Sequence, residues 1–197
     1  LEKPERYNRL HDARRRASQT SGFVIAQEQS AGYCFWVVAP SKRWDFVFQG
    51  SAGCFHENFC ASAKRAFFDW DGDVPMPSEL VGNTQKHLVE WRRCHGASAP
   101  TVIANILRRS DGSPRAHVVF RVVSEGKECL FGSVTNMPDA LGLSDKGIDT
   151  GLYKSDAKQL RLPACVKRGS TNFYGVENPD RETFDASCIC VHSPETI

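Results

Sequence analysis

The chain has 197 residues, of which 41% are hydrophobic and 24% are charged, and its formal net charge is +2. This length is enough for one domain with a sizeable core, so we expect a single domain over residues 1–197, with room for two lobes. No apolar run approaches the roughly 18 residues that a membrane span requires, and no secretory leader is visible, so we expect an intracellular protein without a membrane partner. A net charge this small does not by itself indicate a nucleic-acid-binding protein.

The first part of the chain is expected to contain two helices, a hairpin and a third strand. An Arg- and Ala-rich run predicts a helix over residues 3–18. Two apolar segments separated by QSAG predict a hairpin, with strands near residues 22–28 and 33–40. A short amphipathic helix after Ser41 and a strand over residues 66–71 follow.

The middle of the chain has clearer signals for helix starts and turns. Pro75 and Pro77 precede a predicted helix over residues 78–94, which carries an apolar stripe. The turn SDGSP then joins two apolar strands, residues 101–109 and 115–123, in a second hairpin.

The last third of the chain is less regular. Residues 127–142 are ambiguous and are compatible with a helix, short strands and turns follow, and a final strand is expected near residues 184–191. Helices and strands mix without a regular βαβ alternation, which favours an α+β fold with a largely antiparallel mixed sheet and flanking helices.

The eight cysteines lie far apart, mostly in apolar stretches, and lack the paired CxxC spacing of a zinc ribbon. We therefore expect reduced thiols in the core. Cys188, Cys190 and His192 in CICVH would share one face of a strand and are the nearest approach to a metal cluster, but a buried alternating strand explains the same pattern.

Two carboxylates close the apolar strand in RAFFDWDGDVP. The period of two places Asp69 and Asp71 on one side of that strand, with Phe68 and Trp70 on the other. Two like charges side by side are costly unless a cation or water neutralises them, so the pair indicates a site for a divalent metal. The purely structural alternative is a strand-end turn in which Asp69 caps the backbone or pairs with Arg65.

Two other motifs compete for the same acids. A calcium loop fails, because its sixth and twelfth positions would be Val74 and Leu80 in place of Gly and Glu. The nucleophile motif of the haloacid-dehalogenase-like phosphatases resembles DWDGDV, and SDKGID offers late acids at Asp145 and Asp149. Asp73, however, occupies the place of Thr or Val in that motif.

A histidine and a group of cations extend the candidate site. His117 lies in the apolar strand RAHVVFRVV, where a hydrogen-bonded core histidine is the alternative. Further on, Asp149 is followed by several cations. Carboxylates hold metals and a nucleotide triphosphate needs cations beyond them, so this order fits nucleotide chemistry, with candidates Lys158, Arg161 and Lys167.

These motifs together resemble those of the archaeo-eukaryotic primases, in the branch of the eukaryotic primase-polymerases (PrimPol) and the herpesvirus primases. The first family motif, DxD or DxE after an apolar strand, is matched by Asp69 and Asp71, and the second, a histidine opening an apolar strand, by His117. The resemblance covers roughly residues 7–170. The third motif is an acid, a Tyr, then RL and a Lys six residues after the Arg, matched by Asp149, Tyr153, Arg161 and Lys167.

The resemblance implies a primase-polymerase catalytic core of RRM-like type that transfers nucleotides on a DNA template, as a DNA primase, a DNA polymerase or both. Asp69, Asp71 and Asp149 would hold two Mg²⁺ or Mn²⁺ ions. The incoming triphosphate would be bound by one histidine and several cations: His117, Arg161, Lys167, Lys158 and Arg115, the last standing where the family usually has Ser.

The resemblance also implies the partners. These are single-stranded or primed DNA, an NTP or dNTP substrate, and replication proteins such as a helicase or a single-strand-binding protein, in DNA replication or DNA damage tolerance. The location would be nuclear or mitochondrial, or the host nucleus for a viral member. The family's zinc-binding segment is not recognisable, and a non-catalytic nucleic-acid-binding relative is the alternative to an enzyme.

Overall fold

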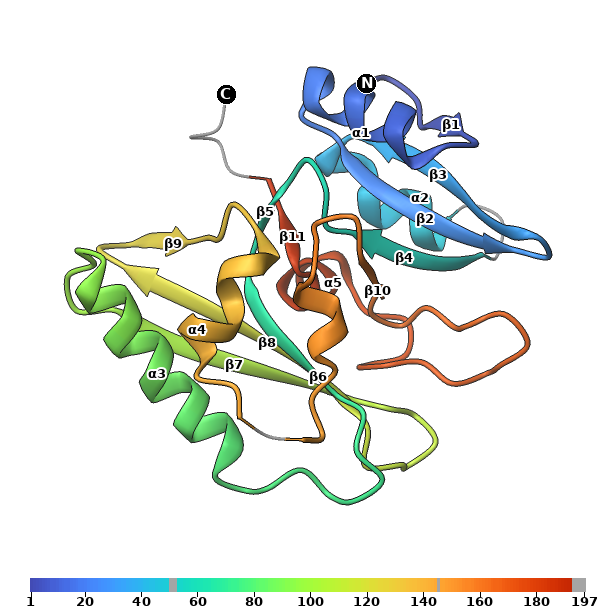
Figure 1. Cartoon of the computed structure of the whole chain (residues 1–197). Helices are drawn as coiled ribbons and strands as arrows, with labels where there is room; N and C mark the ends of the chain where they lie inside the picture. Colours follow the sequence, from blue (N-terminus) through green and yellow to red (C-terminus); the bar gives the residue numbers. More distant parts are fainter. Residues whose placement is uncertain (50–52, 145, 193–197) are drawn as a thin grey trace.

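The computed structural model describes residues 1–49, 53–144 and 146–192. Within these ranges the chain forms two larger antiparallel sheets, a two-stranded ladder and five α-helices (Figure 1). This confirms the α+β class expected from the sequence. The assignment of one domain stays a prediction.

The first sheet has five strands in the order β1-β3-β2-β4-β10, and every pair is antiparallel. The predicted first hairpin is present as β2 and β3. Helix α1 (Leu10–Thr20) packs on this sheet through its buried Ala13 and Ala17, and α2 (Arg43–Phe48) follows β3 after the 3-10 turn η1 (Pro40–Lys42). The strands are β1 (Glu5–Tyr7), β2 (Phe23–Gln29), β3 (Gly32–Val38), β4 (Cys54–Asn58) and β10 (Gln159–Arg161).

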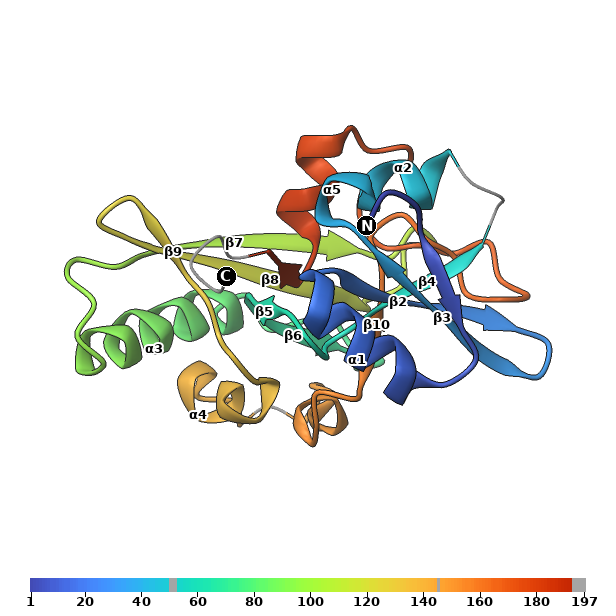
Figure 2. The same ribbon diagram turned by 90° about the horizontal axis from the view of Figure 1, so that it is seen from above.

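The second sheet has the order β6-β8-β7, with β9 also paired to β8. The predicted second hairpin is present as β7 and β8, and the predicted middle helix as α3 (Leu80–Cys94). Helices α3 and α4 (Met137–Leu141) cover one face of this sheet (Figures 1 and 2). The strands are β6 (Ala66–Trp70), β7 (Thr101–Arg108), β8 (Ala116–Ser124) and β9 (Lys127–Cys129).

The C-terminal segment is tied to the rest of the chain by buried charged side chains. Helix α5 (Arg181–Ser187) is followed by β11 (Cys190–Val191), which pairs with β5 (Ala63–Lys64). Arg43 of α2 donates to Asp185 at 2.9 Å and to the Cys190 carbonyl at 2.6 Å.

Two further side chains complete this arrangement. Both carboxylate oxygens of Glu57 in β4 accept backbone N–H groups, from Ile189 and Cys190, at 2.8 Å. Arg65 donates to the Glu128 carboxylate at 2.6 Å and to the carbonyls of Asp185 and Cys188. We call Arg43, Glu57 and Arg65 the C-terminal clamp, because they bind one segment from α2, from β4 and from the position just before β6.

Two predicted elements differ from the structure, one in where it begins and one in its type. The first helix begins at Leu10 and not at residue 3, because residues 5–7 pair with β3 as an edge strand. The predicted final strand is mostly α5, which begins where the Asp180 carboxylate accepts the N–H of Thr183 at 2.7 Å. Within the ambiguous residues 127–142, only the 3-10 turn η2 (Val134–Asn136) and α4 are helical.

All eight cysteines are free, as expected, although Cys94 is exposed. The CICVH hypothesis of a metal cluster is not supported, because Cys188 caps α5 and only Cys190 and Val191 form a strand. In the described part of the chain, no helix is long and apolar enough to cross a membrane.

Candidate active site

The three acids expected to act together lie on two backbone segments that run side by side. The N–H of Asp149 donates to the carbonyl of Asp69 at 3.0 Å, and the N–H of Asp71 donates to the carbonyl of Gly147 at 2.8 Å. Trp70, between the two acids of the first segment, forms an antiparallel bridge with Ile148. The free side of β6 is thus extended by a segment from late in the sequence, which brings Asp149 to the DxD pair.

Asp69 is a mostly buried carboxylate with one unsatisfied oxygen. Its side chain is 15% exposed, and its Oδ1 has no hydrogen-bond partner among the described residues. Burial, and after it the charges of Asp71 and Asp149, raise the pKa of Asp69 from 3.8 to about 7, although Arg115 and Arg161 oppose the shift. Such an oxygen fits a cation, which would supply the opposite charge that is missing.

Asp71 and Asp149 are held by other partners. Arg115 Nε lies 3.1 Å from Asp71 Oδ1, and Asp149 Oδ1 accepts the N–H of Gly151 at 2.9 Å, where it caps the 3-10 turn η3 (Thr150–Tyr153). In these positions, no group of three His, Cys, Asp or Glu side chains in the described ranges could hold a metal ion. Asp71 and Asp149 would have to turn toward Asp69 to ligate the same ion.

His117 lies directly opposite Asp69 in the β6–β8 ladder. Its Nε2 is 3.8 Å from Asp69 Oδ1, which is too long for a hydrogen bond. Burial, with smaller contributions from the charges of Arg161 and His56, lowers the pKa of His117 to about 3. The imidazole is therefore neutral at neutral pH and keeps one N–H that can donate to a phosphate oxygen.

Tyr174 connects His117 to Arg161. Its ring stacks on the imidazole with centroids 3.6 Å apart and planes inclined by 16°, and the Arg161 guanidinium lies 5.4 Å from its centroid. Arg161 also donates to the Asn172 carbonyl at 3.2 Å, while its buried Nε has no partner among the described residues. We call His117, Tyr174 and Arg161 the His–Tyr–Arg row, which joins the second sheet to the first.

A second buried histidine lies next to this row. His56 of β4 is opposite Arg161 in the β4–β10 ladder, and its Nδ1 has no partner within the described ranges. Burial, then the charge of Arg161, and to a smaller extent that of Lys167, lower the pKa of His56 to about 4. Lys167 is exposed on the loop after β10.

Two motif residues have positions that favour other roles. The buried Tyr153 donates its hydroxyl to the Phe67 carbonyl at 2.7 Å, so it fixes the segment after Asp149 to β6. Lys158 is exposed just before β10, and its carbonyl accepts the N–H of Phe59 at 3.1 Å. The structure gives Lys158 no ion pair among the described residues and does not connect it with the acids.

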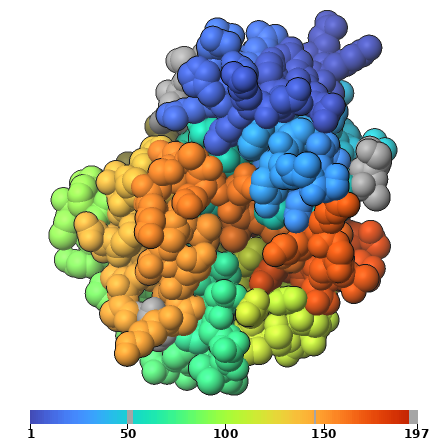
Figure 3. Space-filling model, turned by 45° about the vertical axis from the view of Figure 1, so that its right-hand side comes forward, coloured from blue at the N-terminus to red at the C-terminus, as the bar shows by residue number. Residues whose placement is uncertain are grey.

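The segments that carry these residues meet on one face of the molecule. Figure 3 displays this face, where the stretch after β6, the β7–β8 loop, residues 146–158 and the loop after β10 adjoin one another. The pairing of Arg115 with Asp71 and the backbone bridge between Arg109 and Tyr174 agree with this view. Carboxylates and cations from four separate parts of the sequence therefore surround one surface region.

Sequence reasoning missed His56 and Tyr174. His56 stands in CFHENF, where three consecutive polar residues between phenylalanines in a strand could have indicated a buried polar site. Tyr174 lies in an irregular loop and carried no such signal.

Of the two late acids of the phosphatase alternative, only Asp149 is among the described residues, because Asp145 lies outside them.

A comparison with known protein families finds no family model that matches this chain, and no curated protein matches it.

Proposed function

We propose that this chain is the catalytic core of a template-directed nucleotidyltransferase, a DNA primase or polymerase of the archaeo-eukaryotic primase type with its RRM-like core. The observation that carries the proposal is the meeting of Asp69, Asp71 and Asp149 beside the His–Tyr–Arg row, with Asp69 Oδ1 buried and without a hydrogen-bond partner among the described residues. Three acids of this kind suit divalent cations, and the neighbouring cations suit a triphosphate.

Each residue has a distinct task in this proposal. Asp69, Asp71 and Asp149 would hold Mg²⁺ or Mn²⁺, which when bound would activate a primer 3′-hydroxyl and neutralise charge on the triphosphate. The neutral His117 donates to a phosphate oxygen, and Arg161 and Lys167 attract the triphosphate charge.

Arg115 is the residue that would change partners. It neutralises Asp71 at 3.1 Å before a metal binds, and a cation bound by Asp71 would release its guanidinium toward the substrate phosphates. Because the Arg115 side chain is 38% exposed and Asp71 is 53% exposed, this ion pair is weak and costs little to break.

The partners implied by this function are a single-stranded or primed DNA template and an NTP or dNTP. The compartment would be the nucleus, a mitochondrion or an infected host nucleus, where such templates occur. Lys158, exposed and without an ion pair among the described residues, is better suited to the template backbone than to the triphosphate.

The test is incorporation of labelled nucleotides, with and without a primer, in Mg²⁺ and in Mn²⁺. The double variant Asp69→Ala, Asp71→Ala is expected to lose at least about 100-fold of the activity and to remain folded, because the change removes repulsion and not core packing. Asp139→Ala, on α4, is the matched control and should retain activity. Incorporation by the double variant would contradict the proposal, as would hydrolysis of a phosphomonoester without incorporation by the unmodified chain.

A further inference from the structure

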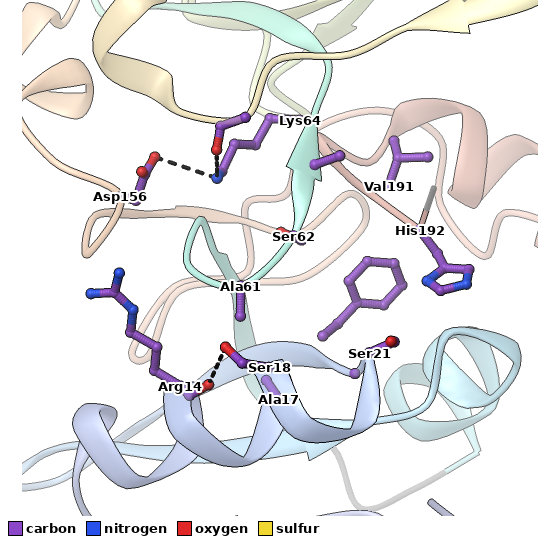
Figure 4. A pocket seen from close by; sticks show the side chains of 14 residues that line it. Arg14, Ala17, Ser18, Ser21, Ala61, Ser62, Lys64, Asp156, Val191 and His192 are labelled. Atoms are coloured by element: carbon purple, nitrogen blue, oxygen red, sulfur yellow. Dashed lines mark hydrogen bonds and ion pairs between the residues drawn. The ribbon is translucent and has the colours of Figure 1, made fainter. Parts of the chain in front are cut away.

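A cavity of about 360 Å³ lies between α1 and the β5–β11 ladder (Figure 4). Lys64, in its wall, precedes Asp69 by five residues along an extended segment, so roughly 17 Å separates the cavity from the acids. The cavity is therefore distinct from the candidate active site, although one stretch of chain borders both.

One end of the cavity is charged. The Lys64 side chain is 2% exposed, and its Nζ donates to the Gly132 carbonyl at 2.8 Å and lies 3.4 Å from Asp156 Oδ1. Asp156 also accepts the N–H of Val134 at 2.9 Å, so its charge is already well compensated. Arg14 lies at the same end in Figure 4 and has no ion pair among the described residues. The two cations thus exceed the single acid at this end.

The wall of the cavity also carries hydroxyl groups. Ser62 adds a buried hydroxyl group, while the Ser18 hydroxyl already donates to the Arg14 carbonyl at 3.0 Å. Cations together with hydroxyls are the donors that bind phosphate oxygens.

The other end of the cavity is aromatic. It is lined by Phe23, Val191 and His192, and Figure 4 shows His192 and Val191 on the side away from Arg14 and Asp156. The guanidinium of Arg43 covers the Phe23 ring 4.2 Å from its centroid, which fixes the ring in the wall. This end therefore offers a planar group the small part of the Phe23 ring that is left uncovered, together with the exposed His192 imidazole.

We propose that this cavity binds a nucleoside phosphate, with the phosphate between Arg14 and Lys64 and the base toward Phe23 and His192. The size of the cavity is at the lower end of the range for small-molecule sites, which fits one nucleotide. This site does not rest on the proposed nucleotidyl transfer, because none of its residues belongs to the acid cluster or the His–Tyr–Arg row.

The test is titration of the whole chain with AMP in EDTA, followed by amide NMR shifts. EDTA removes the divalent metal that nucleotide binding at the acids would use, and the positions of the shifted amides then separate binding in the cavity from binding near Asp69. Shifts are expected at Ser18, Ser62 and Gly132, and adenosine or inorganic phosphate alone should bind more weakly than AMP. A 5′-phosphorylated oligonucleotide tests whether a strand end carries the same phosphate group into the cavity.

The variant Arg14→Gln should weaken AMP binding about tenfold, the loss expected for one charge-assisted contact. The control is Arg15→Gln on the same helix, because Arg15 already pairs with Asp12 at 3.1 Å. Ser18→Phe, at an exposed helix position, should fill the cavity and abolish binding with the fold intact. Absence of AMP binding, shifts confined to residues near Asp69, or equal weakening by Arg15→Gln would overturn the proposal, whatever the outcome of the incorporation assay.

Discussion

The stretch from Arg65 to Asp69 carries a charged side chain of low exposure at each end, and the two side chains differ in how their hydrogen bonds are satisfied. At the first end Arg65 donates to a carboxylate and to two backbone carbonyls, and in the same clamp both oxygens of Glu57 accept N–H groups. At the other end Asp69 Oδ1 accepts no hydrogen bond from the described residues, and Asp71 and Asp149 add charge of the same sign. Burial raises the pKa of Glu57 and of Asp69 alike, so the difference lies in their partners.

This difference distinguishes charged side chains that stabilise the fold from charged side chains that are available to a ligand. A buried ion whose bonds are all made holds the fold in one arrangement, and its removal leaves its partners unsatisfied. A buried carboxylate that is left without a partner lowers stability, and such groups are concentrated where a ligand or a reaction uses them. Mutations at the two ends should therefore change stability with opposite signs.

The largest effect is expected at the clamp. Arg65→Met should lower the free energy of unfolding by about 3–5 kcal/mol, because the carbonyls of Asp185 and Cys188 would lose a buried donor and Glu128 would be left with Arg121, 3.8 Å away. Urea unfolding measures this loss. Arg93→Met, at an exposed position of α3, is the control and should change stability little. Equal stability of the two variants would show that the clamp is not structural.

At the other end, Asp69→Asn should stabilise the protein at high pH. The pKa of Asp69 is about 7 in the folded chain against 3.8 ordinarily, so the folded state keeps a proton that the unfolded state has lost between these values. Stability of the unmodified chain should therefore fall as the pH rises from 4 to 7. The variant avoids this loss, which amounts to up to about 4 kcal/mol above pH 7 and vanishes near pH 4.

Urea unfolding at pH 4.5, 6 and 8 measures this difference. The matched control is Asp71→Asn, which should change stability by less than about 1 kcal/mol at each pH, because Asp71 is half exposed and its pairing with Arg115 is weak. A stability difference for Asp69→Asn that does not depend on pH would contradict the raised pKa.

A divalent cation bound by Asp69 should remove the loss of stability that its ionised carboxylate causes. Mn²⁺ at about 100 times its dissociation constant should raise Tm by roughly 5–10 °C at pH 8. The increase should be smaller at pH 5.5, where Asp69 is protonated and cannot ligate, and absent in Asp69→Asn. A thermal shift of equal size in that variant would mean that Mn²⁺ binds elsewhere.

The smallest effect is expected in the His–Tyr–Arg row. Tyr174→Ala should raise the nucleotide KM about tenfold, because loss of the stacked ring frees His117 and Arg161 to leave their positions. Tyr174→Phe keeps the ring and should restore KM. Loss of thermal stability in Tyr174→Ala without any change in KM would make the stacking purely structural.

The parts of the fold that follow from local sequence were predictable. The SDGSP turn and its flanking apolar strands gave the second hairpin, and the proline-led amphipathic run gave α3. Helix α5 was mistaken for a strand because Phe184, Ser187 and Cys188 are buried at helical spacing within a segment that also alternates. The Asp180 cap at the start of α5 favours the helix, whereas the apolar pattern alone is compatible with both a helix and a strand.

Only the site residues that belong to the recognised motifs could be predicted from the sequence. The motifs named Asp69, Asp71, Asp149, His117 and Arg161 as neighbours, and the structure brings their backbones or charges together. The stacking of Tyr174 depends on the path of a loop with no periodicity. The pairing of Arg115 with Asp71 likewise depends on how the β7–β8 loop meets the end of β6.

The hydrogen bonds at the start of β6 also fix which side of the strand each residue occupies at its end. The backbone of Lys64 exchanges two hydrogen bonds with Phe131, at 2.9 and 2.8 Å, and the Arg65 N–H donates to the Ile189 carbonyl at 2.9 Å. Side chains alternate along a strand, so a slip of one position against β8 would turn Phe68 toward Tyr174 and bury the Asp69 carboxylate against α3 and α4. Strand register changes only by whole residues. The acid site is therefore either fully formed, when β6 pairs with β8 in the native register, or absent.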